Sequence, residues 1–453
     1  MTKDSLTPKS LHNGLLGQNS PMKAREMSVE EAAALVRPRD AIGFGIITGT
    51  PVALFRALGA RSDWEDLTFS GGLSLGSPDV FLHPNVHYRV NFFGGNERAL
   101  IAKGADVQHV PSFFRHYGIL IQHLKPRVMM APVSMPDANG RVSLSLYNGA
   151  TLEELVRAGR DPDRLLIVEA SPHFPRTHAL VGHENHLDLE DIDVIVYTDE
   201  EPTTFANDPG SLADSKIAEF AAQYIPDGAT LQTGIGAVPN LVARALARGD
   251  GGEYGVHSEM FTDGLFELMA AGKATNSKKT INRGTAVITF AAGTRAMYDF
   301  MDDNPDIGVA PVFYTNDPHV IAQNHRMVSI NSALEVDLHG QIMADTIGAR
   351  QFSGVGGHMD FLEGTSLSLE HASLICLQST AAVDGVLKSR IIGDMTPHST
   401  VTSPRQVAGV IVTEYGSADL RGLTVKERAA ALTGIAHPQF RDELTAAAEL
   451  LGR

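Results

Sequence analysis

The chain has almost no cysteine, because Cys376 is the only one among its 453 residues. A single cysteine excludes an internal disulfide and a zinc site built on several cysteines. It also fits a reducing compartment, so we expect a cytoplasmic protein. Cys376 lies in the apolar run SLICLQ. That setting favours a buried, unreactive thiol over a catalytic one.

Long apolar runs and an excess of basic charge are also lacking. No stretch approaches 18 apolar residues, so no membrane-spanning helix is expected. Residues 1–22 are polar and do not resemble a signal peptide, and we expect them to form a flexible extension. The 37 basic and 53 acidic side chains give a net charge of −16. Such a charge repels nucleic-acid phosphates, although a local basic patch could still bind a small anion.

The apolar segments that are present are short and alternate with helical patterns. The clearest strand-length runs are residues 127–135, 164–170, 193–198, 285–293 and 408–415. This alternation predicts an α/β fold with mainly parallel sheets. A polar stretch with proline and glycine at residues 200–213 shows no periodicity. We therefore expect an N-terminal domain over 23–205 and a C-terminal domain over 214–453.

Parts of the two halves repeat each other. PVALFRAL at 51–58 resembles PNLVARAL at 239–246, and both follow a glycine-rich loop. Ser70 and Ser258 are separated by the same 188 residues as Pro51 and Pro239. Several matches in one register predict two related α/β domains in tandem.

Glu259, in the segment GVHSEMFTDG, is the candidate catalytic residue. It follows a predicted short strand, and Asp263 suits the N-cap of the next helix. Ligands of open α/β sheets bind at this carboxyl edge of the strands. At the repeat offset Glu259 corresponds to Gly71, so the shared scaffold does not require the carboxylate. From the pattern alone, a solvated loop carboxylate is the commoner interpretation, and a core histidine is the commoner interpretation of His257.

Two glycine-rich loops could hold a ligand. LQTGIGAVPN at 231–240 predicts a strand, a loop and a helix whose backbone N–H groups could bind a phosphate or carbonyl. Pro239 stands where the dinucleotide fingerprint has its third glycine, which argues against NAD. SGVGGHMDFLEG at 353–364 could offer N–H donors to an oxyanion. A structural turn and a flexible surface loop are the respective alternatives.

Other polar groups are weaker candidates. Glu335 is a rival carboxylate, although it fits the polar face of a half-buried strand. Lys388 and Arg390 form a basic pair that could meet phosphates or remain solvated. No metal-ligand spacing stands out, and we expect no metal site. Neither GxSxG nor GxxxxGK[ST] is present.

Five segments taken together resemble the acetyl-CoA hydrolase/transferase family, the class I coenzyme A transferases. They are LQTGIGAVPN, GVHSEMFTDG, INSALEVDLHGQI, SGVGGHMDF and VTEYGSADLRGLTVKERAAALTGIAHPQFRDEL. Within the family the pattern is most similar to the 4-hydroxybutyrate and butyryl-CoA:acetate CoA-transferases. The resemblance implies two α/β domains of the CoA-transferase type and a homodimer. It also implies that coenzyme A is a substrate and that no cofactor is bound permanently.

The resemblance also assigns roles to residues. It implies that Glu259 is the nucleophile. It implies contacts with CoA for Gly234, Ile235, Gly236, Ala237, Val238, Asn331, Leu334, Gly356, Gly357 and Lys388. Ser171 stands where relatives commonly carry asparagine, and such first-half departures leave the identity of the acids open.

The implied reaction is transfer of CoA between short-chain carboxylic acids by a ping-pong mechanism through a glutamyl-CoA thioester. An acyl-CoA hydrolase that uses the same glutamate is the alternative. A CoA-binding protein without turnover is a remoter one, because both glycine loops and Glu259 are present.

Overall fold

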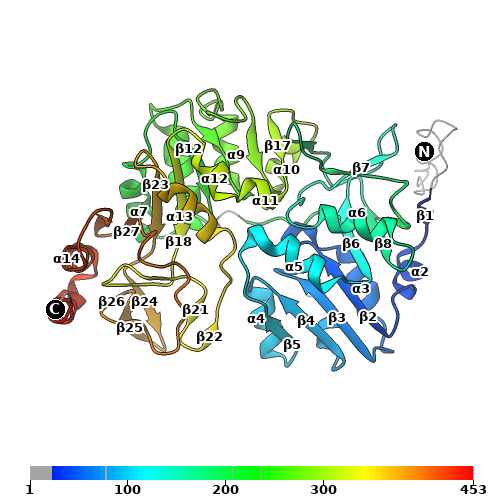
Figure 1. Cartoon of the computed structure of the whole chain (residues 1–453), viewed down its shortest axis with the longest axis horizontal. Helices are drawn as coiled ribbons and strands as arrows, with labels where there is room; N and C mark the ends of the chain where they lie inside the picture. The colour runs from blue at the N-terminus through cyan, green and yellow to red at the C-terminus, as the bar shows by residue number, and fades with distance from the viewer. Residues whose placement is uncertain (1–22, 77–78, 207, 235, 452–453) are drawn as a thin grey trace, which may run out of the picture.

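The computed structural model describes residues 23–76, 79–206, 208–234 and 236–451 (Figure 1). We call residues 23–206 the first half and 208–451 the second half. The expected flexible extension at 1–22 lies outside the described residues.

The first half is built on one parallel sheet with the strand order β1-β11-β8-β6-β2-β3-β4-β5. Its strands are β1 Arg25–Glu26, β2 Arg39–Phe44, β3 Asp66–Gly71, β4 Val86–Val90, β5 Asp106–His109, β6 Val128–Val133, β8 Leu165–Ala170 and β11 Val194–Tyr197. Every residue of β6 and β8 is buried. Strands buried on both faces are typical of parallel sheets covered by helices on each side.

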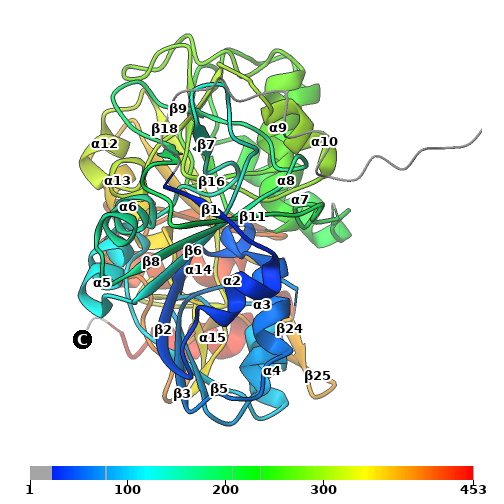
Figure 2. The ribbon, with the colours of Figure 1, turned by 90° about the vertical axis from the view of Figure 1, so that its right-hand side faces the viewer.

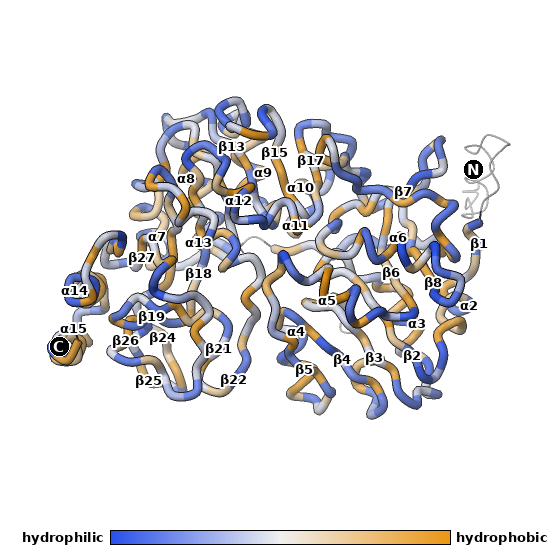
Figure 3. The backbone as a smooth tube through the Cα atoms, in the orientation of Figure 1, coloured by the Kyte–Doolittle hydropathy of each residue, from blue (hydrophilic) through white to orange (hydrophobic). Residues whose placement is uncertain are grey.

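Helices cover both faces of this sheet. They are α2 Val29–Ala34, α3 Val52–Gly59, α4 Gly95–Ala102, α5 Tyr117–Leu124 and α6 Leu152–Arg160. Figure 2 shows α2, α3 and α4 on one side of the strands and α5 and α6 on the other. The two sides form separate apolar clusters. In Figure 3 hydrophobic positions recur along these strands.

The second half has a sheet with the order β13-β12-β18-β23-β27-β28, in which β28 runs antiparallel to β27. Its strands are β12 Thr230–Thr233, β13 Gly255–Val256, β18 Met327–Ser332, β23 Ala372–Cys376, β27 Val410–Thr413 and β28 Gly416–Asp419. The helices of this half are α7 Leu212–Ala222, α8 Ala237–Arg248, α9 Asp263–Ala270, α10 Arg295–Met301, α11 Val312–Thr315, α12 Pro318–Ala322, α13 His358–Ser366, α14 Val425–Ile435 and α15 Arg441–Ala448.

Short strands and 3-10 turns complete the structure. The additional strands are β7 Arg141–Ser143, β9 His178–Ala179, β10 His186–Asp188, β14 Met260–Phe261, β15 Ala286–Ile288, β16 Phe290–Ala291, β17 Ile307–Val309, β19 Glu335–Asp337, β20 Ile342–Met343, β21 Thr346–Ile347, β22 Arg350–Gln351, β24 Thr380–Val383, β25 Val386–Ser389 and β26 Ile391–Ile392. The 3-10 turns are Ile47–Gly49, Asp79–Leu82, Phe114–His116 and Pro438–Phe440.

The two main sheets repeat one topology. The order β11-β8-β6-β2-β3 in the first half matches β27-β23-β18-β12-β13 in the second. In each half the first of the central strands is followed by a helix and then by its neighbour, as β2–α3–β3 and β12–α8–β13. The predicted α/β fold of two related halves with mainly parallel sheets is confirmed.

The repeat also explains why only one half carries the glutamate. Gly71 ends β3, and a Cβ there would overlap the ring of Phe44. Since no side chain fits at Gly71, the carboxylate at the corresponding position belongs to the second half alone.

The two halves are joined by β9, a strand that was not predicted from the sequence. β9 of the first half pairs in parallel with β17, which in turn pairs with β15. Residues 200–206 and 208–211 of the predicted boundary stretch are coil, and its last two residues begin α7, whose N-cap is Ser211. The division into domains 23–205 and 214–453 stays a prediction.

One helix start differs from the sequence prediction. Asp263 is the first residue of α9, and Thr262, in an extended conformation, is its N-cap. The Asp263 carboxylate accepts hydrogen bonds from the backbone N–H and hydroxyl of Thr294 instead. Asp263 therefore bonds Thr294 instead of capping α9.

Candidate active site

Glu259 lies between β13 and β14 and lines a cavity of about 490 Å³ that has walls from both halves. The backbone N–H groups of Thr289 and Phe290 donate to the Glu259 carbonyl at 3.1 and 3.2 Å. These bonds fix the backbone, so the half-buried side chain projects into the cavity from a defined position.

The Glu259 carboxylate has one amide partner. Nδ2 of Asn316 donates to Oε2 at 2.6 Å and also to the Asp360 carboxylate at 3.0 Å. Burial raises the pKa of Glu259 to about 8; the Asn316 hydrogen bond opposes this rise and the charge of Asp360 adds to it. A carboxylate with a raised pKa is a stronger nucleophile once it is ionised.

The second glycine loop lies against this carboxylate. A Cβ at Gly357 would overlap the Glu259 carboxylate, and a Cβ at Gly356 would lie 3.8 Å from Oε1. Gly356 has a φ of +52°, a conformation that favours glycine. Gly357 is the N-cap of α13. The structure therefore brings two predicted site residues to within contact of the candidate nucleophile.

The first glycine loop contributes in part. Gly234 lines the cavity, but its N–H already donates to the Ile330 carbonyl at 3.0 Å. Gly236 is the exposed N-cap of α8, with a φ of +130°. Ala237 and Val238 form the first turn of that helix and do not line the cavity. Ile235 lies outside the described residues.

Asn331 and Leu334 also line the cavity. The Asn331 amide exchanges hydrogen bonds with Gln232, at 3.1 and 3.3 Å. Arg390 lines it too, held by a 2.8 Å bond from Nε to the Leu334 carbonyl. Lys388 is exposed on β25 and does not line the cavity. Of the basic pair, the structure brings Arg390 to the site.

The rival candidates lie elsewhere. Glu335 is not a lining residue, and it accepts a 2.9 Å bond from the Thr396 hydroxyl. His257 is buried, with Nε2 at 2.8 Å from the Thr315 carbonyl, and burial lowers its pKa to about 3. Burial also raises the pKa of the Cys376 thiol to about 12. His257 and Cys376 are core residues, as expected.

Three residues around Glu259 were not predicted from the sequence. Asn316 and Asp360 are both completely buried beside Glu259, and Arg115 of the first half pairs with Asp360 at 2.6 Å. Asp360 follows the glycines of the second loop by three residues, which could have marked it. Asn316 and Arg115 belong to no pattern that the sequence shows.

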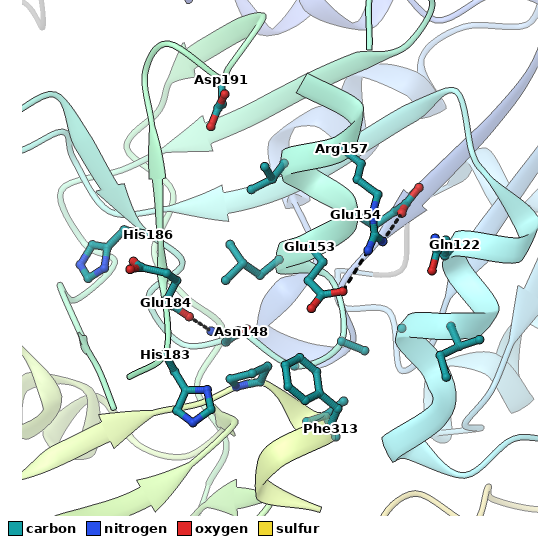
Figure 4. Close-up of a pocket in the computed structure, with 18 of the residues that line it drawn as sticks. Gln122, Asn148, Glu153, Glu154, Arg157, His183, Glu184, His186, Asp191 and Phe313 are labelled. Carbon is teal, nitrogen blue, oxygen red and sulfur yellow. Dashed lines mark hydrogen bonds and ion pairs between the residues drawn. The ribbon is translucent and has the colours of Figure 1, made fainter. Parts of the chain in front are cut away.

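A larger cavity of about 850 Å³ lies among α5, α6, the β7–β10 pair and α11 (Figure 4). Neither Glu259 nor a residue of the glycine loops lines it. Most of its charged side chains pair with one another, as Arg157 does with Glu153 and Glu154, whereas Arg115 pairs with Asp360. The smaller cavity therefore has the better chemistry for a site.

The described residues hold no group of three or more His, Cys, Asp or Glu side chains that could bind a metal ion. Within the same ranges, no helix combines the length and the apolar character that crossing a membrane requires.

The cavity and its carboxylate define a class of protein. A glutamate held against glycine backbone, at the junction of two repeated α/β halves, is suited to acyl transfer through a covalent glutamyl intermediate.

Comparison with known proteins identifies the family. Residues 293–448 match the model of the acetyl-CoA hydrolase/transferase C-terminal domain. The chain is 35% identical to the succinyl-CoA:cyclohexane-1-carboxylate CoA transferase of Geobacter metallireducens, over 98% of this chain and 100% of that protein. It is 36% identical to the butyryl-CoA:acetate CoA-transferase of Anaerostipes caccae, over 93% and 95%.

A solved structure agrees with these matches. The crystal structure of RipA from Yersinia pestis has a TM-score of 0.85 and 32% identity, and the match covers 98% of this chain and 99% of that one. The chain belongs to the acetyl-CoA hydrolase/transferase family, and the resemblance inferred from the five segments is confirmed.

Proposed function

We propose that this protein is a CoA-transferase that moves coenzyme A between short-chain carboxylic acids, with Glu259 as the nucleophile. The observation that carries the proposal is the Glu259 carboxylate, held in a cavity against Gly356 and Gly357. Acyl-CoA and small carboxylic acids are then the substrates.

The chemistry follows from the carboxylate. Ionised Glu259 attacks the acyl-CoA carbonyl, and the C–S bond breaks to give a mixed anhydride and CoA thiolate. The thiolate attacks the glutamyl carbonyl, which releases the first acid and leaves a glutamyl-CoA thioester. A second carboxylate reverses these steps and leaves as the new acyl-CoA. No net oxidation or reduction occurs.

The glycine loop has a role in this sequence. Each attack places negative charge on a carbonyl oxygen, and nearby backbone N–H groups can stabilise that oxyanion. The loop at Gly356 and Gly357 lies against the Glu259 carboxylate, which supports this role. A Cβ at Gly357 would overlap the carboxylate itself.

The proposed CoA contacts have unequal support. The N-terminus of α8, at Gly236 to Val238, offers backbone N–H groups suited to phosphate or carbonyl oxygens. Asn331 and Leu334 lie on the cavity wall, which Glu259 also lines. Lys388 has less support because it is exposed on β25, whereas Arg390 reaches the cavity.

Part of the cavity wall near Glu259 is apolar. Ile46, Ile47 and Phe114 of the first half pack in one apolar cluster with Met260 and Phe290. Met260 follows Glu259 in the sequence, and the backbone N–H of Phe290 donates to the Glu259 carbonyl. A second carboxylate on the acyl group would have to be desolvated against this wall. We therefore expect the aliphatic part of the acyl group to lie against this wall.

Water could resolve the same intermediate, which would make the protein an acyl-CoA hydrolase. The two activities differ in whether free CoA accumulates when no acceptor acid is present. The transferase proposal predicts that release of CoA thiol from butyryl-CoA is slow alone, while acetyl-CoA forms rapidly when acetate is added.

Two variants test the role of the nucleophile. Glu259→Gln removes the attacking oxygen anion and should abolish transfer. Glu335→Gln, the matched control outside the cavity, should retain it. Full transfer by Glu259→Gln would reject the assignment.

We also propose a homodimer in the cytoplasm, on the basis of the resemblance and of the single cysteine. Light scattering coupled to size exclusion measures the assembly directly, and a mass of one chain across the working concentration range would reject the dimer.

A further inference from the structure

A chain of polar contacts runs from the first half to the nucleophile. Arg115 donates from Nη1 to Oδ1 of Asp360 at 2.6 Å, and its backbone N–H lies 3.4 Å from Oδ2. Asn316 donates from Nδ2 to Oδ2 of Asp360 and to Oε2 of Glu259. Glu259, Asn316 and Asp360 belong to the second half, so Arg115 is the contribution of the first.

We propose that Arg115 and Asp360 are a positioning pair, which holds the Asn316 amide in the orientation that directs its N–H bonds at Glu259. The pair thereby couples the geometry of the nucleophile to the contact between the two halves. The proposal rests on the function proposed for Glu259.

The orientation of the amide is the first step of the argument. A side-chain amide can be turned so that either its NH₂ or its carbonyl faces a neighbour. The Asn316 NH₂ lies between two carboxylates, where both of its hydrogens find acceptors. The opposite orientation would direct a carbonyl oxygen at the Asp360 carboxylate and, once it is ionised, at Glu259. Asp360 therefore selects the orientation that serves Glu259.

Asp360 orients Asn316 only as an ionised acceptor, and it needs Arg115 to remain ionised. Its side chain has no exposed surface. Burial raises the pKa of Asp360 to about 6, while the Asn316 hydrogen bond and the Arg115 charge oppose that rise. A buried carboxylate without a cation would take up a proton and could then donate a hydrogen bond itself. Arg115 keeps it an acceptor.

Arg115 is itself held in place. Its guanidinium lies 4.8 Å from the centre of the Phe113 ring, and Nη2 pairs with Glu363 at 3.0 Å. The neighbouring backbone N–H of Phe114 donates to the Gly356 carbonyl at 3.1 Å. One short segment of the first half thus contacts both the glycine loop and the carboxylate that orients Asn316.

The histidines and the tyrosine near Glu259 are neutral over the working pH range. Burial lowers the pKa of His358, which lines the cavity on α13, to about 4. Burial also raises the pKa of Tyr147, and the charge of Glu259 adds to this rise. His257 is neutral for the reason given above. The remaining ionisable side chains are Asp360, Arg115 and Glu363, together with Arg98 and Arg390 of the cavity wall.

A purely structural ion pair between the halves is the competing explanation. Loss of such a pair would lower the melting temperature and the amount of active enzyme, but each remaining active site would behave as wild type. A positioning pair affects kcat per active site and the ionisation of Glu259.

The test uses the full chain with Asp360→Asn, Arg115→Lys and Arg115→Met, and Arg141→Met as a control. Arg141 pairs with Glu184 and Asp188 away from Glu259. We expect Asp360→Asn and Arg115→Met to lower kcat for butyryl-CoA:acetate transfer about 10- to 100-fold, with a smaller change in KM. Arg115→Lys keeps a cation and should recover part of the loss.

A second measurement does not depend on turnover. Carbodiimide modifies protonated carboxyl groups, and peptide mass spectrometry follows labelling of Glu259 against pH. Removal of the Asp360 charge should shift the midpoint of labelling to lower pH in Asp360→Asn. This readout is informative even if wild type catalyses no transfer, so failure of the proposed function is recognised separately.

The outcomes are distinct. A lower kcat together with a shifted labelling midpoint supports the positioning pair. Wild-type kcat per active site with an unchanged midpoint in both Asp360→Asn and Arg115→Met would overturn it. If Arg115→Met does not fold, Asp360→Asn and Arg115→Lys decide the question by the same two readouts.

Discussion

At the scale of single residues, the site depends on one carboxyl group, and burial raises the pKa of that group. Glu259 is half-buried, close to Asp360, and has a pKa of about 8. Near neutral pH most of it is protonated, and only the ionised form attacks a thioester.

Activity should therefore rise with pH. We expect kcat/KM for butyryl-CoA to increase between pH 6 and about 8 and then to level off, because the ionised fraction of Glu259 grows over that interval. A profile that is flat from pH 6 to 9 in a series of buffers would be incompatible with a raised pKa.

Stability should change in the opposite sense. A folded-state pKa above the unfolded value of 4.5 means that the folded chain binds more protons between pH 4.5 and about 8. This contribution to the free energy of unfolding is complete below pH 4.5 and is lost as pH rises through about 8. Glu259→Gln lacks it, so the melting temperature of wild type should fall relative to this variant over that interval.

At the scale of elements, the glycine loop before α13 approaches the Glu259 carboxylate so closely that a side chain at Gly357 would overlap it. Gly357→Ala places a methyl group on the Glu259 carboxylate, and we expect kcat to fall by about 100-fold. Gly434→Ala in α14 is the matched control, because its new Cβ meets no atom within 4 Å and alanine favours a helix by about 1 kcal/mol. Equal kcat values for the two variants would show that the close approach is unimportant.

Elements defined by local pattern could be predicted from the sequence. The runs at 127–135, 164–170 and 193–198 became β6, β8 and β11 with nearly the expected bounds, because buried parallel strands are continuous apolar segments. The run at 285–293 was wrong as a single strand, since it divides into β15 and β16. The division lies where Thr289 and Phe290 turn to bond the Glu259 carbonyl.

Contacts distant in sequence could not be predicted in this way. Glu259 was identified by the repeat and by the family pattern, and the glycines by their spacing. Asn316 reaches Glu259 only through the folding of the second half, and Arg115 reaches Asp360 only when the two halves pack together. A lone asparagine or arginine carries no periodicity that would reveal such a contact.

At the scale of the whole molecule, the two halves share secondary structure and should not unfold independently. β9 of the first half completes the sheet of β15 and β17, and Arg115 bonds Asp360 across the junction. We expect one cooperative calorimetric transition for the full chain. Two well-separated transitions would instead show that each half is stable alone.

The most direct test of the central claim is to trap the intermediate on Glu259. After incubation with butyryl-CoA and treatment with borohydride, which reduces a thioester to a primary alcohol, peptide mass spectrometry should find that alcohol in place of the Glu259 carboxyl group. Wild-type enzyme that catalyses transfer under the same conditions while Glu259 remains an unmodified carboxyl, or while another residue is reduced, would contradict the account.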